Sequence, residues 1–423
     1  MFGAFKGRGI RTPWHLRVLY ISTFLLRTAF GALLLLISAY FKEDEVNGLL
    51  NVAIVAVPYP LAEMATANYF GILSDRLGRK PIIVAGTTLA SIVVLLYALS
   101  DNVWYLTTLH GIHGIGAAAT VAPAIAMIAD YAHSHDRGRQ MGWFDYSTFL
   151  GYIVGAVVGG FLIELVTVPV GFVIIAALLA GSAVMLYTLV KKTPPARGIE
   201  HRSGFAELRT VFKVREVRLM FPIWLIIATL LGLALTYLPI IMMSQDIEGS
   251  TIGIMFGLAG VALGLLQPFW GKVSDLVGRI PVMAYGVFSI AGIVVLLLFF
   301  PNSAIEITDD GVKFKLLGMI PLAILGLGAG AFVPSALAMM ADSSESKSYG
   351  ATMGLYSFAL GFGAFIAETL GLTIIVLTGK NDAPGWILYF AAALVGLAVV
   401  LMIVFFFAAF LKGRVKREPD GTA

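Results

Sequence analysis

The chain has 423 residues, of which 59% are hydrophobic and only 13% are charged, against about 25% charged residues in an ordinary soluble domain. This composition excludes a soluble globular protein. The formal net charge of +4 requires no nucleic-acid partner, because anionic lipid headgroups account for it. The chain has no Cys, which excludes disulfides, thiolate catalysis and Cys-based metal sites.

Twelve apolar stretches along the chain are long enough to cross a hydrocarbon layer of about 30 Å as helices. They are longer and more continuous than the short alternating strands of a membrane barrel, so the predicted fold class is an all-α membrane protein. The first stretch is too long for a signal-peptide core and is interpreted as a span. We expect the spans at residues 16–40, 47–71, 82–100, 103–130, 140–165, 168–190, 219–243, 251–271, 281–300, 316–341, 349–378 and 385–411.

Basic residues are concentrated in alternate connections between these spans. Only four lysines fall in the other connections, and Arg27 lies within a span; the four are Lys42, Lys313, Lys315 and Lys380. Because Lys and Arg are retained on the cytoplasmic side, this distribution predicts a multi-pass protein of the cell membrane with both termini in the cytoplasm.

The longest basic connection, residues 191–218, divides the chain into halves of six spans each, residues 1–190 and 219–423. The halves repeat each other: residues Gly71, Ser74, Asp75, Gly78, Arg79, Pro81 and Gly86 recur as the same residue types 200 positions later. Two parallel six-helix repeats are the layout expected of a transporter whose halves rock around a substrate site near the bilayer midplane.

The peptide GILSDRLGRKP, residues 71–81, follows the second span, and GKVSDLVGRIP, residues 271–281, follows the eighth. With twelve spans around them, these loops closely resemble the signature loop of the major facilitator superfamily, and the resemblance covers essentially the whole chain. It implies the fold of that superfamily, twelve helices in two six-helix repeats.

The residues of the first loop have a chemistry of their own. Gly71 and Gly78 allow a tight turn and close helix contact, and Asp75 can accept hydrogen bonds from a helix N-terminus. The basic residues of the loop can reach carboxylates such as Asp130 or bind lipid phosphates. These basic residues are Arg76, Arg79 and Lys80.

The resemblance implies an inner latch, in which Asp75 engages the start of the eleventh span and Arg79 pairs toward the end of the fourth. The alternative is a static anchor of headgroup-binding charges. The second copy keeps Asp275 and Arg279 but has no basic residue where the first copy has Arg76 and Lys80, which predicts a weaker latch.

The stretch GYIVGAVVGG in the fifth span resembles the antiporter motif of the same superfamily, except that Ala156 replaces its Pro. Without that Pro the kink is not guaranteed. A gating role and a Gly-rich face for helix packing both remain open. The motif glycines are Gly151, Gly155, Gly159 and Gly160.

In the fourth span, family members often carry a buried Arg followed three residues later by Gln, where this chain has His110 and His113. Arg does not titrate in proteins, whereas a His with an unperturbed pKa of about 6.5 exchanges protons near neutrality. The two residues share one helix face. Either they handle protons as a pair, or both are neutral and hydrogen-bonded within the bundle.

Ionisable residues within spans cost about 2.5 to 3.5 kcal/mol at the bilayer centre and face a cavity or a partner. Arg27 lies roughly 15 Å, and Glu63 roughly 12 Å, from the inner ends of their spans, so the two can pair. Protonation of Glu63 would then release Arg27; the alternative is a permanent salt bridge. Asp145 is expected near the inner vestibule, while Glu164 and Glu368 are expected in the headgroup layer.

These observations predict a proton-coupled secondary transporter that works by alternating access, acts as a monomer, contacts membrane lipids and needs no cofactor or metal. Export of amphipathic drugs or metabolites is the leading hypothesis, and uptake or exchange of an organic anion is the alternative, suggested by Arg27. A non-transporting membrane sensor is the hypothesis from another class. An enzyme is disfavoured because no nucleophile, base and orienting group can be assembled within the spans.

Overall fold

The computed structural model describes residues 13–42, 47–131, 137–191, 212–300, 305–308, 311–343, 349–379 and 381–415. The N-terminal helices are α1 (Trp14–Phe41), α2 (Gly48–Ala56), α3 (Pro58–Leu77), α4 (Arg79–Tyr97), α5 (Val103–Tyr131), α6 (Arg137–Leu165) and α7 (Val168–Leu189). The C-terminal helices are α9 (Arg215–Met243), α10 (Gly249–Gly264), α11 (Gln267–Val277), α12 (Arg279–Phe299), α13 (Leu316–Ala329), α14 (Phe332–Ser343), α15 (Tyr349–Thr378) and α16 (Ala383–Val415).

A short hairpin lies in the connection between α12 and α13. Its strands are β1 (Ile305–Thr308) and β2 (Gly311–Phe314), and they pair antiparallel with Ile305 opposite Phe314. The end of the bundle that carries this hairpin is called the hairpin end below. The other end, which carries the turns at Gly78 and Gly278, is called the motif end.

Twelve helical segments of the described chain are long and apolar enough to cross a membrane, which confirms the predicted number and the all-α membrane class. Three of these spans are broken helix pairs, α2–α3, α10–α11 and α13–α14. In the first two pairs, the second helix begins with a Pro in its first two positions. Because Pro has no backbone N–H to donate to the preceding turn, the helix restarts there.

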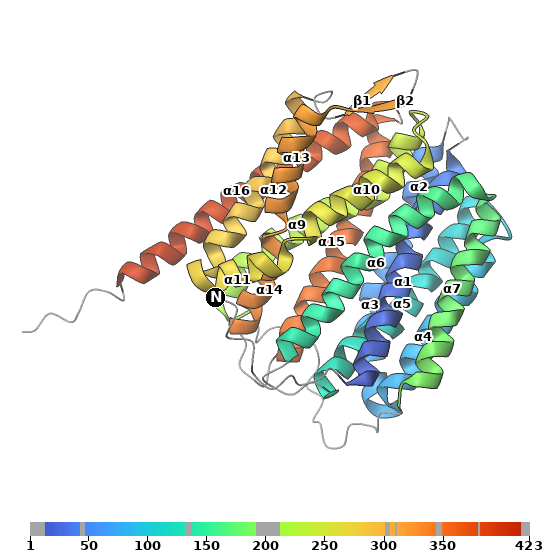
Figure 1. Cartoon of the computed structure of the whole chain (residues 1–423), viewed down its shortest axis with the longest axis horizontal. Coiled ribbons are helices and arrows are strands. Elements are labelled where there is room, and N and C mark those ends of the chain that lie inside the picture. Colours follow the sequence, from blue (N-terminus) through green and yellow to red (C-terminus); the bar gives the residue numbers. More distant parts are fainter. Residues whose placement is uncertain are drawn as a thin grey trace, which may run out of the picture.

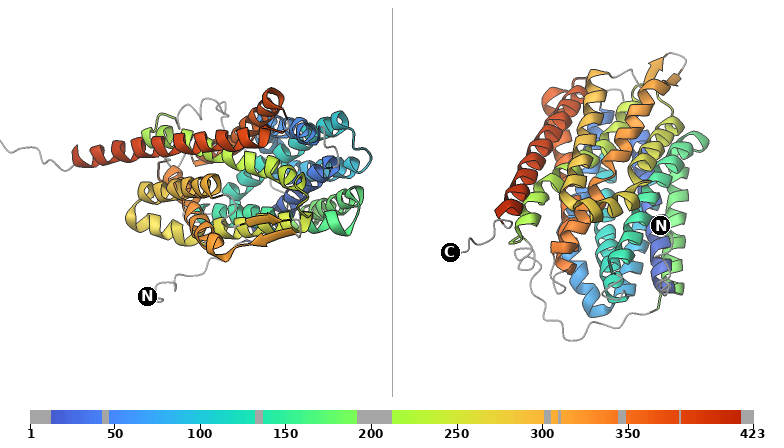
Figure 2. Two further views of the ribbon diagram at one scale, coloured as in Figure 1. Left: turned by 90° about the horizontal axis from the view of Figure 1, so that it is seen from above. Right: turned by 60° about the vertical axis from the view of Figure 1, so that its left-hand side comes forward.

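The helices form two sets, α1–α7 and α9–α16 (Figure 1). Each set buries an apolar core that consists mainly of its own residues. The core of α1–α7 includes Leu33, Tyr97 and Phe172, and that of α9–α16 includes Met283 and Phe332. The further views in Figure 2 show α16 along the outer edge of the C-terminal set. Most of the predicted linker, residues 192–211, lies outside the described residues.

Two further buried clusters contain residues of both sets, and both lie toward the hairpin end. One joins Leu35 of α1 to Met243 of α9 and Ile252 of α10. The other joins Ala53 of α2 to Tyr237 of α9 and to α15. Apolar side chains from both sets therefore close the bundle at the hairpin end.

Candidate functional site

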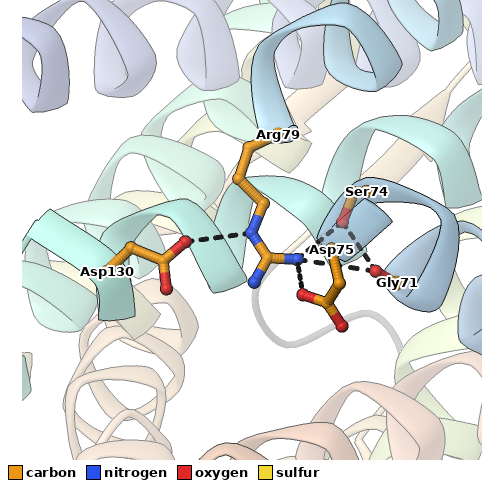
Figure 3. A network of polar contacts seen from close by, with 5 residues as sticks. All are labelled: Gly71, Ser74, Asp75, Arg79 and Asp130. Carbon is orange, nitrogen blue, oxygen red and sulfur yellow. Dashed lines mark hydrogen bonds and ion pairs between the residues drawn. The ribbon is translucent and has the colours of Figure 1, made fainter. Parts of the chain in front are cut away.

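A buried arginine at the start of α4 connects the motif-end termini of three helices (Figure 3). Arg79 Nε donates to Asp130 Oδ2 of α5 at 3.0 Å, and its Nη1 donates to Ser74 Oγ of α3 at 2.7 Å. The guanidinium also forms an ion pair with Asp75 and lies 3.5 Å from the carbonyl oxygen of Gly71. Arg79 thus contacts the end of the fourth span, where the resemblance placed its partner.

The other residues of the first loop match their expected roles only in part. Gly78 has a φ of +91°, a conformation that side-chain-bearing residues rarely adopt, so the tight turn depends on it. Gly71 lies inside α3 and faces open space, so the close helix contact expected there is not seen. Arg76 is exposed, and Lys80 Nζ lies 5.3 Å from the centre of the Tyr187 ring.

The expected contact of Asp75 with the start of the eleventh span lies outside the described part of the structure, since no side chain is described between residues 343 and 357. The described contacts of Arg79 all lie among the N-terminal helices. It therefore braces α3, α4 and α5 against one another.

The second copy of the loop repeats the same network. Arg279 Nε donates to Asp342 Oδ2 at 2.9 Å, Nη1 donates to Ser274 Oγ at 2.7 Å, and an ion pair joins Arg279 to Asp275. Gly278 has a φ of +99°. Asp342 is 60% exposed against 50% for Asp130, and Arg279 is 21% exposed against 9% for Arg79. Water therefore screens the second network more strongly.

A polar and aromatic cluster lies within the spans of the N-terminal set. Arg27 of α1 donates from Nη1 to the Tyr152 hydroxyl of α6 at 3.1 Å, and its guanidinium carbon lies 5.5 Å from the centre of the same ring. Glu63 of α3 is partly buried and lies within electrostatic range of Arg27. No ion pair within 4.0 Å joins these two described residues. The predicted partners thus share one site, in which Tyr152 is a direct contact of Arg27.

The two histidines of α5 lie beside this cluster. Both are buried, and their rings are 6.1 Å apart. His110 Nδ1 is hydrogen-bonded to the Tyr97 hydroxyl at 2.8 Å, while His113 Nδ1 has no hydrogen-bond partner among the described residues. The ring of Tyr59 lies 5.1 Å from His110 and 5.3 Å from His113. Tyr59, on the same helix as Glu63, therefore connects the histidines to the Arg27 site.

The glycines of the antiporter-like motif face two different helices. A Cβ on Gly151 would lie 2.6 Å from the Arg27 Cβ, and one on Gly159 would lie 2.7 Å from the Cα of Ala32. A Cβ on Gly155 would collide with a backbone carbonyl oxygen of α1. Gly160 instead meets α10, where a Cβ would collide with a carbonyl oxygen of that helix. Three glycines therefore allow α6 to approach α1, and the fourth allows it to approach the C-terminal set.

The remaining membrane carboxylates differ from one another. The backbone of Asp145 lies in α6, but its side chain is outside the described part of the structure. Glu164 Oε1 accepts the backbone N–H of Ser250 at 2.6 Å, at the start of α10. Glu368, which was expected in the headgroup layer, is buried between helices of the described chain. It is only 8% exposed, because Gly232 lets α9 pack closely against α15 and cover this side chain.

An open groove of about 420 Å³ lies between α1 and α6, on the motif-end side of Arg27. Arg17, Tyr20 and Phe24 of α1 line it opposite Trp143 and Tyr146 of α6. An apolar and aromatic lining with one cation suits an amphipathic molecule.

Comparison with known proteins identifies the family of the chain. The family model described as Major Facilitator Superfamily matches residues 19–305 and, in a second match, residues 232–422. The chain belongs to this superfamily. It is a multi-pass membrane transporter that acts on small-molecule substrates, and not an enzyme.

Two curated relatives are similar to this superfamily member. The tetracycline resistance protein, class B, of Escherichia coli is 27% identical over 327 residues, which are 74% of this chain and 75% of the relative. The quinolone resistance protein NorA of Staphylococcus aureus is 28% identical over 147 residues, 35% of this chain and 38% of NorA. The match to NorA thus covers little more than a third of either protein.

Among solved structures, the nucleoside transporter NupG superposes with a TM-score of 0.68 at 17% identity, over 92% of this chain and 99% of NupG. At this identity the similarity shows the fold of the superfamily alone.

The sequence did not single out the residues that contact the predicted site residues through hydrogen bonds or aromatic rings. Tyr59, Tyr97 and Tyr152 are ordinary aromatic residues of apolar spans, so nothing in their local sequence distinguishes them. Ser74 and Ser274 are different, because both copies of the loop carry them and both bind the arginine. The internal repeat of this superfamily member was therefore a usable signal for these two contacts.

Proposed function

We propose that this protein is a proton-coupled exporter of amphipathic drugs or metabolites, working by alternating access as a monomer in the cell membrane with both termini in the cytoplasm. The halves that rock are residues 1–190 and 219–423, with residues 191–218 as the linker. The observation that carries the proposal is the Arg27, Tyr152 and Glu63 site inside the N-terminal set. The similarity to two drug resistance proteins supports the direction of transport.

Coupling in this proposal depends on the charge of Glu63. Ionised, Glu63 attracts Arg27 toward α3; protonated, it leaves Arg27 to the Tyr152 hydroxyl of α6. Because Arg27 touches α6, which also packs against α10, the change reaches the contact between the two sets. His110 and His113 are proposed as the proton-handling pair next to this site.

In the closed state of the hairpin end, the two shared apolar clusters seal the route to that side. The open groove between α1 and α6 is proposed as the place where a substrate first binds from the motif end. Separation of the shared clusters, with closure of the motif end, would complete the cycle.

The test is the internal pH of proteoliposomes that hold the purified protein, recorded while a panel of drugs and organic anions is added outside. Wild type and Glu63→Gln are compared, and Glu248→Gln, an exposed carboxylate at the start of α10, is the control. We expect substrate-dependent proton movement in wild type and in the control, and its loss in Glu63→Gln. Substrate flux without proton movement would refute coupling. If Arg27→Ala abolished transport of the organic anions but not of the drugs, the organic-anion alternative would be favoured.

A further inference from the structure

Two of the broken spans, α10–α11 and α13–α14, have their breaks side by side in the C-terminal set. The first break lies between residues 264 and 267, and the second lies between residues 329 and 332. A Cβ on Gly330 would collide with the carbonyl oxygen of Leu263, so backbone meets backbone where the two spans break. Toward the hairpin end α10 packs against α13, and toward the motif end α11 packs against α14 (Figure 1).

The break in the second of these spans frees the carbonyl oxygen of Leu327. In an unbroken helix this oxygen would accept the N–H of Ala331, four residues later. That N–H instead donates to the carbonyl oxygen of Gly328 at 2.9 Å. The indole Nε1 of Trp270, on α11, donates to the Leu327 oxygen at 2.8 Å. Trp270 therefore replaces the helical donor that the break removes.

The motif-end parts of the two spans are also joined to each other. Arg279, at the start of α12, contacts Asp275 of α11 and Asp342 of α14 in the second arginine network. One side chain thus ties α11 to α14, so a change of angle at one break requires a change at the other. Trp270 links α11 to α13 instead, and its hydrogen bond therefore crosses the breaks.

The N-terminal set differs at the matching positions. The repeat partner of Trp270, 200 positions earlier, is Phe70, whose side chain has no N–H to donate. The span in the same place as α13–α14 is α5, which is one helix from Val103 to Tyr131. The paired breaks and the indole that bridges them thus belong to the C-terminal set.

We infer that the indole of Trp270 stabilises a bent form of the C-terminal set and releases the Leu327 oxygen when the set straightens. In the bent form, which accompanies the closed hairpin end, the oxygen accepts from the indole. In the straight form it accepts from the N–H of Ala331, and α11 and α14 swing together at the motif end. Because the same oxygen is satisfied by a different donor in each form, the two forms are discrete alternatives.

The test is the distance between spin labels on α10 and α11, measured by double electron–electron resonance in lipid nanodiscs. The chain has no Cys, so cysteines introduced at Leu258 and Leu276, which are both exposed, take the labels alone. Trp270→Phe keeps an aromatic ring and removes the N–H. Straightening lengthens the span, so we expect the ratio of the longer to the shorter label distance to rise about fivefold in Trp270→Phe, as for the loss of one neutral hydrogen bond.

Trp386→Phe, which changes an exposed indole on α16, is the control and should leave this ratio as in wild type. Identical distance distributions in wild type and in a folded Trp270→Phe variant would overturn the inference. A shift toward the shorter distance would also overturn it, because the indole would then oppose the bend. The measurement needs neither a substrate nor a proton gradient, so it decides this inference separately from the proposed function.

Discussion

The two arginine networks at the motif end should differ in strength, and the difference follows from their exposure to water. Exposed ion pairs contribute about 0.2 to 1 kcal/mol, whereas breaking a buried pair costs about 3 to 5 kcal/mol. Arg79 is 9% exposed and its partner Asp130 is half exposed, so this pair belongs near the upper limit of the exposed class. We expect Asp130→Asn to lower the free energy of unfolding by about 1 kcal/mol.

The second network supplies a matched comparison. Arg279 and Asp342 are both more exposed, so Asp342→Asn should lower the free energy of unfolding by only about 0.3 kcal/mol. Thermal unfolding in detergent, followed by Trp fluorescence, should therefore show a drop in Tm about three times larger for Asp130→Asn. High salt should reduce the smaller effect more, because it screens exposed charges first. Equal drops, or a larger drop for Asp342→Asn, would refute the reasoning from exposure.

Two further predictions concern α6. Gly155→Leu should prevent α1 and α6 from packing, because its Cβ would collide with the backbone of α1. Gly181→Leu is the control, because Gly181 has open space around it. The yield of folded, monodisperse protein after purification checks this prediction, and equal yields of the two variants would contradict it. Glu164→Gln weakens a charge-assisted bond to the backbone of Ser250 and should shift the hairpin end about fivefold toward opening. A cysteine at Leu35, introduced into a chain without Cys, should then react faster with a water-soluble maleimide, and an unchanged rate would exclude a holding role for Glu164.

Much of the fold could be predicted because the physics of a span is local. Length and apolar content decide whether a segment crosses a bilayer, and both can be read from a window of residues. The break between α2 and α3 was missed because Pro58 lies in the middle of a window that is, on average, long and apolar enough to cross the membrane as one helix. The hairpin lies in the connection between the expected spans 281–300 and 316–341 and was not predicted, because its eight strand residues leave little signal in the sequence.

The site was predictable only in part, because contacts between helices depend on rotation and depth. Arg27 and Glu63 were found by their charge, and the depth argument placed them in the same region. Their spacing, with Tyr152 as the contact of Arg27, depends on how closely α6 approaches α1, which the glycines determine. The burial of Glu368 was not predicted for the same reason: it comes from the close packing of α9, which no property of its own helix reveals.

The glycines of α6 have a consequence for how the protein tolerates substitution. Gly159 faces α1 within its own set, while Gly160, the next residue, faces Gly249 and Gly253 of α10 in the other set. At Gly160 backbone packs on backbone, so this contact between α6 and α10 has no side chains that must change rotamer when the helices separate. A larger side chain therefore has a different effect at each of these adjacent positions. At Gly159 it would obstruct assembly of the N-terminal set, and at Gly160 it would obstruct the return of the two sets to contact after each transport cycle.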